Sequence, residues 1–309
     1  MLGLNKCVFL VVYAIQFILG ILGNGFIGLV NGSGWYKGKR LSLSDFVITI
    51  LALSRILLLW LLLTDGILMA LSLRERDDGI GKQILEVIWT FTNDLSLWLV
   101  TCLSVLYCLK IANFFNPTFF WLKRRVSRVV ECLLLGALFL SSASALSMIH
   151  EFKIFVITTG INDTETILEY FRKKSDYELI HGLGMLWNLP PLIVSLTSNF
   201  LLILSLGRHM WQMQKSGTNS RDSTTEAHKR AIKIILSFLF LFLLYYLALL
   251  MISSSHFLPG TEIIKMIGKI IKLLYPSVHS FILILGHNKL KQAFVQIIWH
   301  KPCHLYTGF

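Results

Sequence analysis

The chain has 309 residues, of which 55% are hydrophobic and only 15% are charged, and its mean hydropathy is +0.67. A soluble globular protein usually carries more charge, and the apolar residues here come in long runs that favour a polytopic membrane protein. The formal net charge of +12 is therefore interpreted as a signal of membrane topology. We expect no nucleic-acid partner.

The sequence motifs give little support to enzyme chemistry. No Walker A loop and no GxSxG sequence occurs. The cysteines are scattered and form no CxxC pair or metal-ligand pattern: they are Cys7, Cys102, Cys108, Cys132 and Cys303. We therefore expect no catalytic residues, no cofactor and no metal site.

The chain begins MLGLNKCVFLVV, which lacks a small-residue cleavage site and continues as an apolar run. This favours an uncleaved first membrane span over a removable signal peptide. Further apolar segments follow along the whole chain. Those of spanning length fall at roughly 8–30, 45–70, 83–107, 129–149, 181–206, 232–254 and 264–286.

The segments between the spans alternate in charge. The loops at 31–44, 108–128 and 207–231 and the tail are rich in Lys and Arg, and their only acids are Asp222 and Glu226. The other loops are mixed or acidic. The positive-inside rule then places the N-terminus outside and the C-terminus in the cytoplasm.

These features predict the fold class. We expect an all-α membrane protein, a seven-transmembrane helix bundle that forms one domain over 1–309. The cytoplasmic tail, 287–309, is predicted to contain a short amphipathic helix at about 288–299. Seven spans with an outside N-terminus are the layout of a heptahelical receptor, a multi-pass protein of the plasma membrane.

Two modification sites are predicted from this topology. Asn162-Asp163-Thr164 is a glycosylation sequon in the longest outer loop, whereas Asn31-Gly32-Ser33 lies on the cytoplasmic side, where glycosylation does not occur. Cys303 lies in the tail near Trp299 and is a palmitoylation candidate, on the weak signal of a lone cysteine beside the membrane.

A charged residue inside a span is a functional hypothesis by default, because it is costly unless paired or hydrated. Arg55 lies about ten residues into the second span and should face the interior of the bundle. Asn24 in the first span is a natural polar partner. The pair is interpreted as a structural network that fixes helix packing, or as a lock that switches conformation, and the two interpretations are compatible.

The seventh span carries three lysines on one helix face, Lys265, Lys269 and Lys272. Lys265 lies nearest water and can snorkel, whereas Lys272 lies deepest and must find an acid, a carbonyl or water. Asp65 lies ten residues beyond Arg55 toward the outside. By depth it is the nearest plausible partner of Lys269.

Six stretches, spread over the whole chain, carry a family signature. They are GNGFIGLVN (23–31), LALSR (51–55), WLVTCLSVLYCLKIANF (98–114), LIVSLTSNFLLILSLGRHMWQM (192–213), TEAHKRAIK (225–233) and PSVHSFILILGHNKLKQAF (276–294). Neither a DRY motif after the third span nor an NPxxY motif in the seventh occurs, which argues against a rhodopsin-like receptor. With these stretches the chain resembles the type 2 bitter taste receptors, a family of vertebrate G-protein-coupled receptors.

The resemblance implies a receptor for small bitter agonists, which bind in the outer half of the bundle, and coupling to a gustducin-type heterotrimeric G protein. The implied ligand-binding residues, with the Lys269–Asp65 pair added, are Trp89, Asn93, Tyr245, Ala248, Lys269 and Asp65. The structural or switch residues are Asn24, Arg55, Pro276 and His279. The implied G-protein contacts are Tyr107, Lys110, His209, His228, Lys229 and Arg230.

The chain departs from the family pattern at three positions. Lys269 stands where several relatives carry an acid, so a preference for amine agonists is not expected here. Ala248 stands where relatives often have an aromatic ring, which predicts a roomier or differently shaped cavity. His287 stands where the family commonly has Asn. Lys269→Glu should change agonist selectivity and leave surface expression intact.

Alternatives remain open from the residues alone. A lysine of the seventh span could form a Schiff base with retinal, with Asp65 or Asp94 as counter-ion. A transporter or channel would also place charges inside the membrane, although no internal repeat links two halves of the chain. The basic loop residues can equally contact membrane lipid headgroups.

Overall fold

The computed structural model describes residues 3–38, 41–71, 80–114, 116–160, 188–215, 223–254 and 262–299. Within them the chain forms helices joined by turns and short loops, and no strand. The long helices are α1 (Leu4–Tyr36), α2 (Leu43–Ala70), α3 (Ile80–Ile111), α5 (Val126–Gly160), α7 (Leu189–Lys215), α8 (Ser223–Ser254) and α9 (Glu262–Gly286). Two shorter helices are α4 (Pro117–Arg124) and α10 (Asn288–Trp299).

All seven long helices are long and apolar enough to cross a membrane, which confirms the predicted seven-helix bundle. A helix is favoured in such segments because it satisfies every backbone N–H and C=O group internally. Several helices are longer than the predicted spans. α3 continues past residue 107 to Ile111, and α7 continues past residue 206 to Lys215, because hydropathy marks only the apolar part of a helix.

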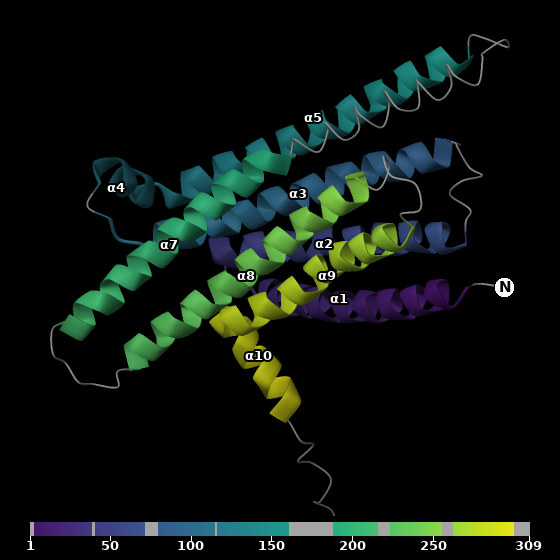
Figure 1. Cartoon of the computed structure of the whole chain (residues 1–309). Helices are drawn as coiled ribbons and strands as arrows, with labels where there is room; N and C mark the ends of the chain where they lie inside the picture. The colour runs from purple at the N-terminus through teal and green to yellow at the C-terminus, as the bar shows by residue number, and fades with distance from the viewer. Residues whose placement is uncertain are drawn as a thin grey trace, which may run out of the picture.

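The long helices lie side by side in an elongated bundle, with α10 projecting away from the end of α9 (Figure 1). α3 contacts α2, α5 and α7, while α9 contacts α1, α2, α8 and α10. These two helices have the most buried apolar segments of the seven. Residues on α3 and α9 are therefore the best placed to connect the two ends of the bundle.

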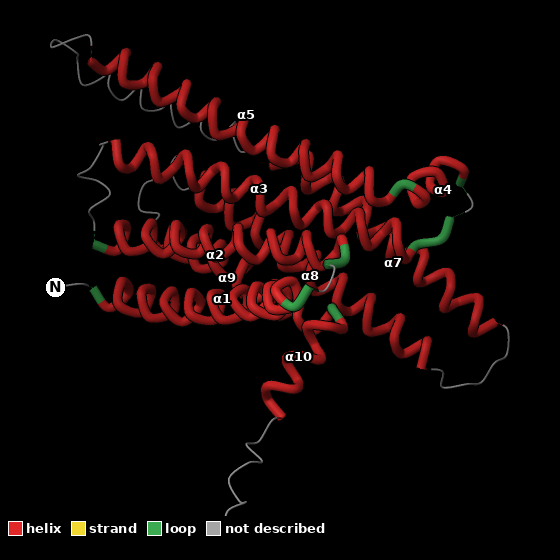
Figure 2. Tube along the Cα trace, turned by 180° about the vertical axis from the view of Figure 1, so that it is seen from behind, coloured by secondary structure: helices red, strands yellow, loops and turns green. Residues whose placement is uncertain are grey.

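The bundle has two ends. The chain begins at one of them, and we call it the N-terminal end (Figure 2). α2 ends there, and α3 and α9 begin there. The opposite end, which we call the α10 end, holds α4, the start of α8 and the junction of α9 with α10. A polar side chain can therefore be placed near one end or the other by its position along its helix.

The helix α4 was not predicted and lies in the basic segment 108–128. The side chain of Asn116 accepts a hydrogen bond from the backbone N–H of Thr118 (3.0 Å), and Pro117 occupies the first turn. Both features favour a helix start. Lys123 donates from Nζ to the carbonyl of Ala112 (2.9 Å), which holds the short helix against the end of α3.

Small residues let α1 and α9 approach closely. A Cβ atom added at Gly20 would lie 2.6 Å from Ser277 Oγ, and one added at Gly23 would overlap Ser280 Oγ and lie 3.1 Å from its Cβ. Ser280 is fully buried. Close contact of this kind is a common way for helices to associate in a membrane, where the hydrophobic effect does not drive them together.

Gly23→Ala should therefore lower the thermal stability of the purified protein, because the added methyl group forces the two helices apart. Overpacking of this kind costs about 1–3 kcal/mol. Gly25→Ala is the matched control, since a Cβ atom there meets nothing within 4 Å. Equal melting temperatures for the two variants would contradict the assigned contact.

Candidate functional site

A buried charge cluster lies at the centre of the bundle. Arg55 is fully buried, and its Nη1 lies 2.6 Å from Nδ1 of His279. Because a guanidinium only donates, His279 Nδ1 is the acceptor and the ring carries its proton on Nε2. The guanidinium carbon also lies 5.1 Å from the ring centroid of Tyr275, within the range of a cation–π interaction. The cluster ties α2 to α9.

The predicted pairing of Arg55 with Asn24 is wrong. Asn24 donates from Nδ2 to the carbonyls of Gly20 (2.9 Å) and Pro276 (3.2 Å), and its Oδ1 has no hydrogen-bond partner among the described residues. Pro276 interrupts the hydrogen-bond pattern inside α9, so Asn24 binds α1 to α9 at the irregular turn. Asn24 and Arg55 both hold α9, but through different atoms.

Near the N-terminal end, Lys269 and Asp65 form an ion pair between α9 and α2. Lys269 Nζ lies 2.7 Å from Asp65 Oδ2, and the two side chains are only 8% and 19% exposed. The partner predicted from depth is therefore confirmed. Because the ammonium contacts a carboxylate, Lys269 does not present an uncompensated positive charge to the bundle interior.

Trp89 on α3 is covered by a second lysine of α9. Lys272 Nζ lies 3.5 Å from the centroid of the Trp89 ring, and Lys272 is buried. A cation–π contact in such a desolvated site is worth about 2 kcal/mol or more. A ligand that stacks on this face of Trp89 has to displace the lysine side chain.

Asn93 and Tyr245 are brought together, as the ligand-site prediction requires. The Tyr245 hydroxyl donates a hydrogen bond to Asn93 Oδ1, and both residues are buried. Ala248, one turn further along α8, is also fully buried, and its carbonyl oxygen lies 3.4 Å from the Cβ position of Gly268. Ala248 thus takes part in a close contact between α8 and α9, which is a packing role.

A line of rings runs from this pair toward the α10 end. The centroids of Tyr245 and Tyr275 lie 4.8 Å apart, those of Tyr275 and His279 5.7 Å, and those of His279 and Phe238 4.7 Å. Asn93 therefore connects through α8 and α9 to the Arg55 cluster and beyond it. Every step of this line is a direct contact between neighbouring side chains.

The line ends at a cavity of about 640 Å³ at the α10 end of the bundle. Its walls come from α3, α7, α8, α9 and the start of α10, and most of the side chains in them are apolar, such as Leu103 and Ile235. The polar lining residues include Asn199, Arg230 and His287, and the last two rings of the line, His279 and Phe238, also form part of its wall. A cavity of this size and character is typical of ligand-binding sites.

Two of the predicted G-protein contacts, Tyr107 and Arg230, line this cavity. Lys110, His209 and Lys229 are exposed at the same end, outside the cavity wall. The side chain of His228 lies outside the described part of the structure. The predicted glycosylation site Asn162 and the candidate Cys303 also lie outside it.

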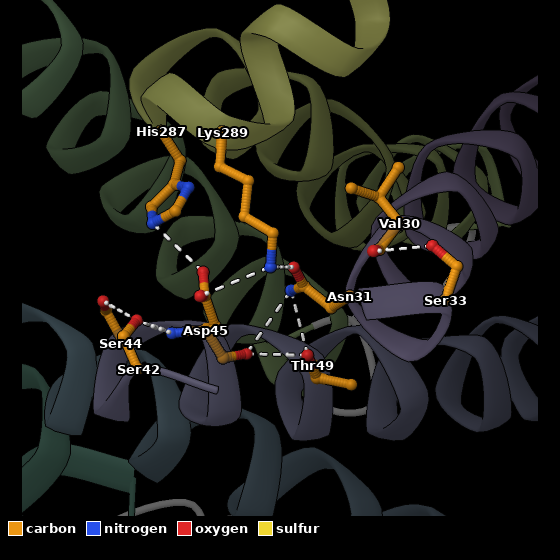
Figure 3. Close-up of polar contacts among 9 residues, drawn as sticks. All are labelled: Val30, Asn31, Ser33, Ser42, Ser44, Asp45, Thr49, His287 and Lys289. Atoms are coloured by element: carbon orange, nitrogen blue, oxygen red, sulfur yellow. Dashed lines mark hydrogen bonds and ion pairs between the residues drawn. The ribbon is translucent and has the colours of Figure 1, made fainter. Parts of the chain in front are cut away.

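Beside the cavity, a polar network joins α1, α2 and α10 (Figure 3). Asp45 lies 3.4 Å from His287 Nε2 through one carboxylate oxygen and 3.4 Å from Lys289 Nζ through the other. Lys289 also donates to Asn31 Oδ1 (2.9 Å), and Asn31 donates from Nδ2 to Thr49 Oγ1 (3.0 Å). This network fixes the start of α10 against the last turns of α1 and the first turns of α2.

Sequence reasoning missed this network. Asp45 is an acid at the start of a predicted span, and the charged residues of the loop before it, 31–44, are all basic. That pattern, together with His287 in place of the family's Asn, was the available signal.

A second set of polar contacts that the sequence did not predict joins α3 to α7. Asn199 donates to Ser104 Oγ (3.2 Å), and Ser104 Oγ lies 3.2 Å from Ser195 Oγ.

Among the described residues, no cluster of three or more His, Cys, Asp or Glu side chains could hold a metal ion. The polar groups instead form hydrogen bonds and ion pairs between helices.

Comparison with known proteins decides the family. Residues 1–302 match the model of the family described as Taste receptor protein (TAS2R). The chain belongs to this taste receptor family. The resemblance to the type 2 bitter taste receptors is thereby confirmed. Members of the family are receptors and not enzymes. The family and the seven helices that can span a membrane together identify the chain as a multi-pass receptor of the plasma membrane.

Individual relatives agree over almost their whole length. Taste receptor type 2 member 3 of Homo sapiens is 60% identical over 309 residues, which are 100% of this chain and 98% of the relative. The protein of the same name from Papio hamadryas is 59% identical over 308 residues, 99% and 98% of the two chains. That from Mus musculus is 51% identical over 309 residues, 100% and 98%. These similarities favour a taste receptor over the retinal-binding and transporter alternatives.

Proposed function

We propose that this taste receptor binds small bitter agonists in the N-terminal half of the bundle and activates a gustducin-type G protein at the α10 end. The N-terminal end would face outside and the α10 end the cytoplasm, as the Lys and Arg distribution favours. The observation that carries the proposal is the line of contacts from Asn93 through Tyr245 and Tyr275 to His279 in the wall of the cavity.

The proposed agonist site lies where Trp89, Asn93 and Tyr245 meet the ion pair of Lys269 with Asp65. In the present arrangement Asn93 Oδ1 accepts from the Tyr245 hydroxyl, and Asn93 Nδ2 donates to Asp94 Oδ1 (3.4 Å). An agonist with its own donor or acceptor would compete for these partners and shift α8 relative to α3. Asp65 and Lys269 would set the charge of the agonists that the site accepts, because a charged agonist would compete for one member of this largely buried ion pair.

The proposed G-protein site is the cavity at the α10 end. Movement of α8 away from α9 would widen it enough to admit the end of a helix, a population shift between two packings of the same helices. Arg230 at the rim and the exposed Lys110 and Lys229 give this end a positive field. Such a field favours an acidic partner surface.

The proposal is tested by calcium imaging of cells that express the chain together with a promiscuous G protein. A panel of bitter compounds should include agonists that raise calcium only in cells with the receptor. Tyr245→Phe, which removes one hydroxyl, should change the order of agonist potencies. A ligand-evoked current that persists without any G protein would instead identify a channel.

Arg230→Ala should reduce G-protein activation about tenfold at equal surface expression, because a charge-assisted contact to the G protein is lost. Agonist affinity for the N-terminal half should stay unchanged in the absence of G protein. Nucleotide exchange in washed membranes measures the first quantity and ligand binding the second. Lys233→Ala is the matched control: Lys233 is exposed on the same helix but does not line the cavity. A similar loss of G-protein activation in both variants would show that Arg230 has no specific role in the G-protein site.

A further inference from the structure

His287 combines three properties that no other lining residue of the cavity shares. It lies at the junction of α9 with α10, its Nε2 faces Asp45 across 3.4 Å, and its side chain is 18% exposed. Its second nitrogen, Nδ1, is buried without a hydrogen-bond partner among the described residues. The ring therefore connects the wall of the cavity to the polar network that holds α10 (Figure 3).

The charged groups around His287 oppose one another. Asp45 on α2 favours the protonated ring, while Lys289 on α10 and Lys110 on α3 disfavour it. Arg230 on α8 lines the same cavity and adds a further positive charge. Burial is the largest effect, and together with the two lysines it lowers the pKa of His287 below its ordinary value despite Asp45. At the pH of the cytoplasm the ring is therefore neutral in this arrangement.

Opening of the cavity would change the balance of effects that sets the pKa of His287. If α8 moves away from α9, water enters beside His287, and both the desolvation and the repulsion by neighbouring lysines weaken. The pKa of His287 then rises toward its ordinary value. A group that binds its proton more tightly in the open form favours that form when it is protonated, so acid shifts the population toward the open cavity.

We propose that His287 is a positioning residue for G-protein activation, whose protonation at the α10 end favours the open form of the cavity. Acid at this face would then strengthen the response to agonist. The inference rests on the function proposed above, since it assigns the cavity to the G protein. It adds a second input to the receptor: proton concentration on the cytoplasmic side.

The sign and the pH range follow from the direction of the shift. Above the ordinary pKa of histidine, about 6.5, the ring is neutral in both forms and pH has no influence through it. The open form gains as pH falls below this value, and the gain levels off once the ring is protonated in both forms. Asp45 limits the size of the effect because it already favours the charged ring in the closed form.

The test measures agonist-stimulated nucleotide exchange in washed membranes that contain the full-length receptor and added G protein. Activation by wild type, relative to that by His287→Asn, should rise about threefold between about pH 7.4 and about pH 6.0. Asn keeps a hydrogen-bonding side chain that does not titrate. Dividing the activation by wild type by the activation by His287→Asn at the same pH cancels the effects of pH on the G protein and on other receptor groups.

His287→Gln provides a second neutral variant of nearly the same length, which decides the matter if His287→Asn does not reach the membrane. A pH profile that is the same in wild type and the neutral variant would overturn the inference, as would a fall of the relative activation in acid. Failure of the proposed function looks different, because no compound would then stimulate exchange by wild type at either pH.

Discussion

Arg55→Met should abolish most of the agonist response, lowering the maximal signal at least about tenfold. Methionine is similar in length but makes no hydrogen bond. The variant removes the donor 2.6 Å from His279 Nδ1 and the cation beside the Tyr275 ring. His279 and Tyr275 belong to the line of contacts between the proposed agonist site and the cavity. In the variant, the Arg55 side chain of α2 no longer holds these two residues in position.

The same variant should also lose stability, because a buried acceptor left without its donor costs about 1–3 kcal/mol. The double variant Arg55→Met/His279→Leu removes both partners and should recover surface expression, since replacing both members of a buried polar pair is often neutral. It should not recover signalling. Arg128→Met, at an exposed arginine, controls for the loss of a positive charge. A double variant that signals normally would contradict a switch role for the cluster.

Depth along the membrane normal was the quantity that the sequence predicted best. Each helical residue advances a fixed 1.5 Å, so counting from the ends of the spans placed Asp65 and Lys269 at similar depth. The structure confirms the pair at 2.7 Å. The seven spans follow from the same reasoning, because the length and apolarity of each segment are properties of the segment itself.

The rotation of each helix about its axis was much harder to predict. Asn24 and His279 both lie at depths that Arg55 can reach, but only His279 points toward it. Which of them does so depends on contacts such as Gly20 with Ser277, which set how α1 and α9 face each other. The sequence indicates which face of a helix is buried, but not which of two buried residues a given side chain will contact.

The network around Asp45 was missed for a related reason. Lys289 and Asp45 are 244 residues apart in sequence, and each has an ordinary local explanation. Asp45 lies in the first turn of α2, where an acid favours the helix start. Lys289 fits the positive-inside pattern. Only the direction in which α10 leaves α9 brings the two together.

The structure also changes what should be expected of Lys269. From the sequence, Lys269→Glu was predicted to alter agonist selectivity and leave surface expression intact. The ion pair with Asp65 makes the second half of that prediction untenable, because the variant places two carboxylates in contact at a site where the side chains are 8% and 19% exposed. Losing one partner of a buried pair costs about 3–5 kcal/mol, and repulsion adds to this.

Lys269→Glu should therefore strongly reduce the amount of receptor at the cell surface, and the exchange variant Asp65→Lys/Lys269→Asp should restore it. Surface labelling of an N-terminal epitope tag measures both. Lys265→Glu is the matched control: it breaks an exposed ion pair with Glu262 on the same helix, which is worth at most about 1 kcal/mol. If the exchange variant is restored, its agonist selectivity then tests the ligand site, since the two charges have changed places while the pair is kept. Unaltered agonist selectivity would show that the ion pair stabilises the packing of α2 against α9 and does not take part in agonist recognition.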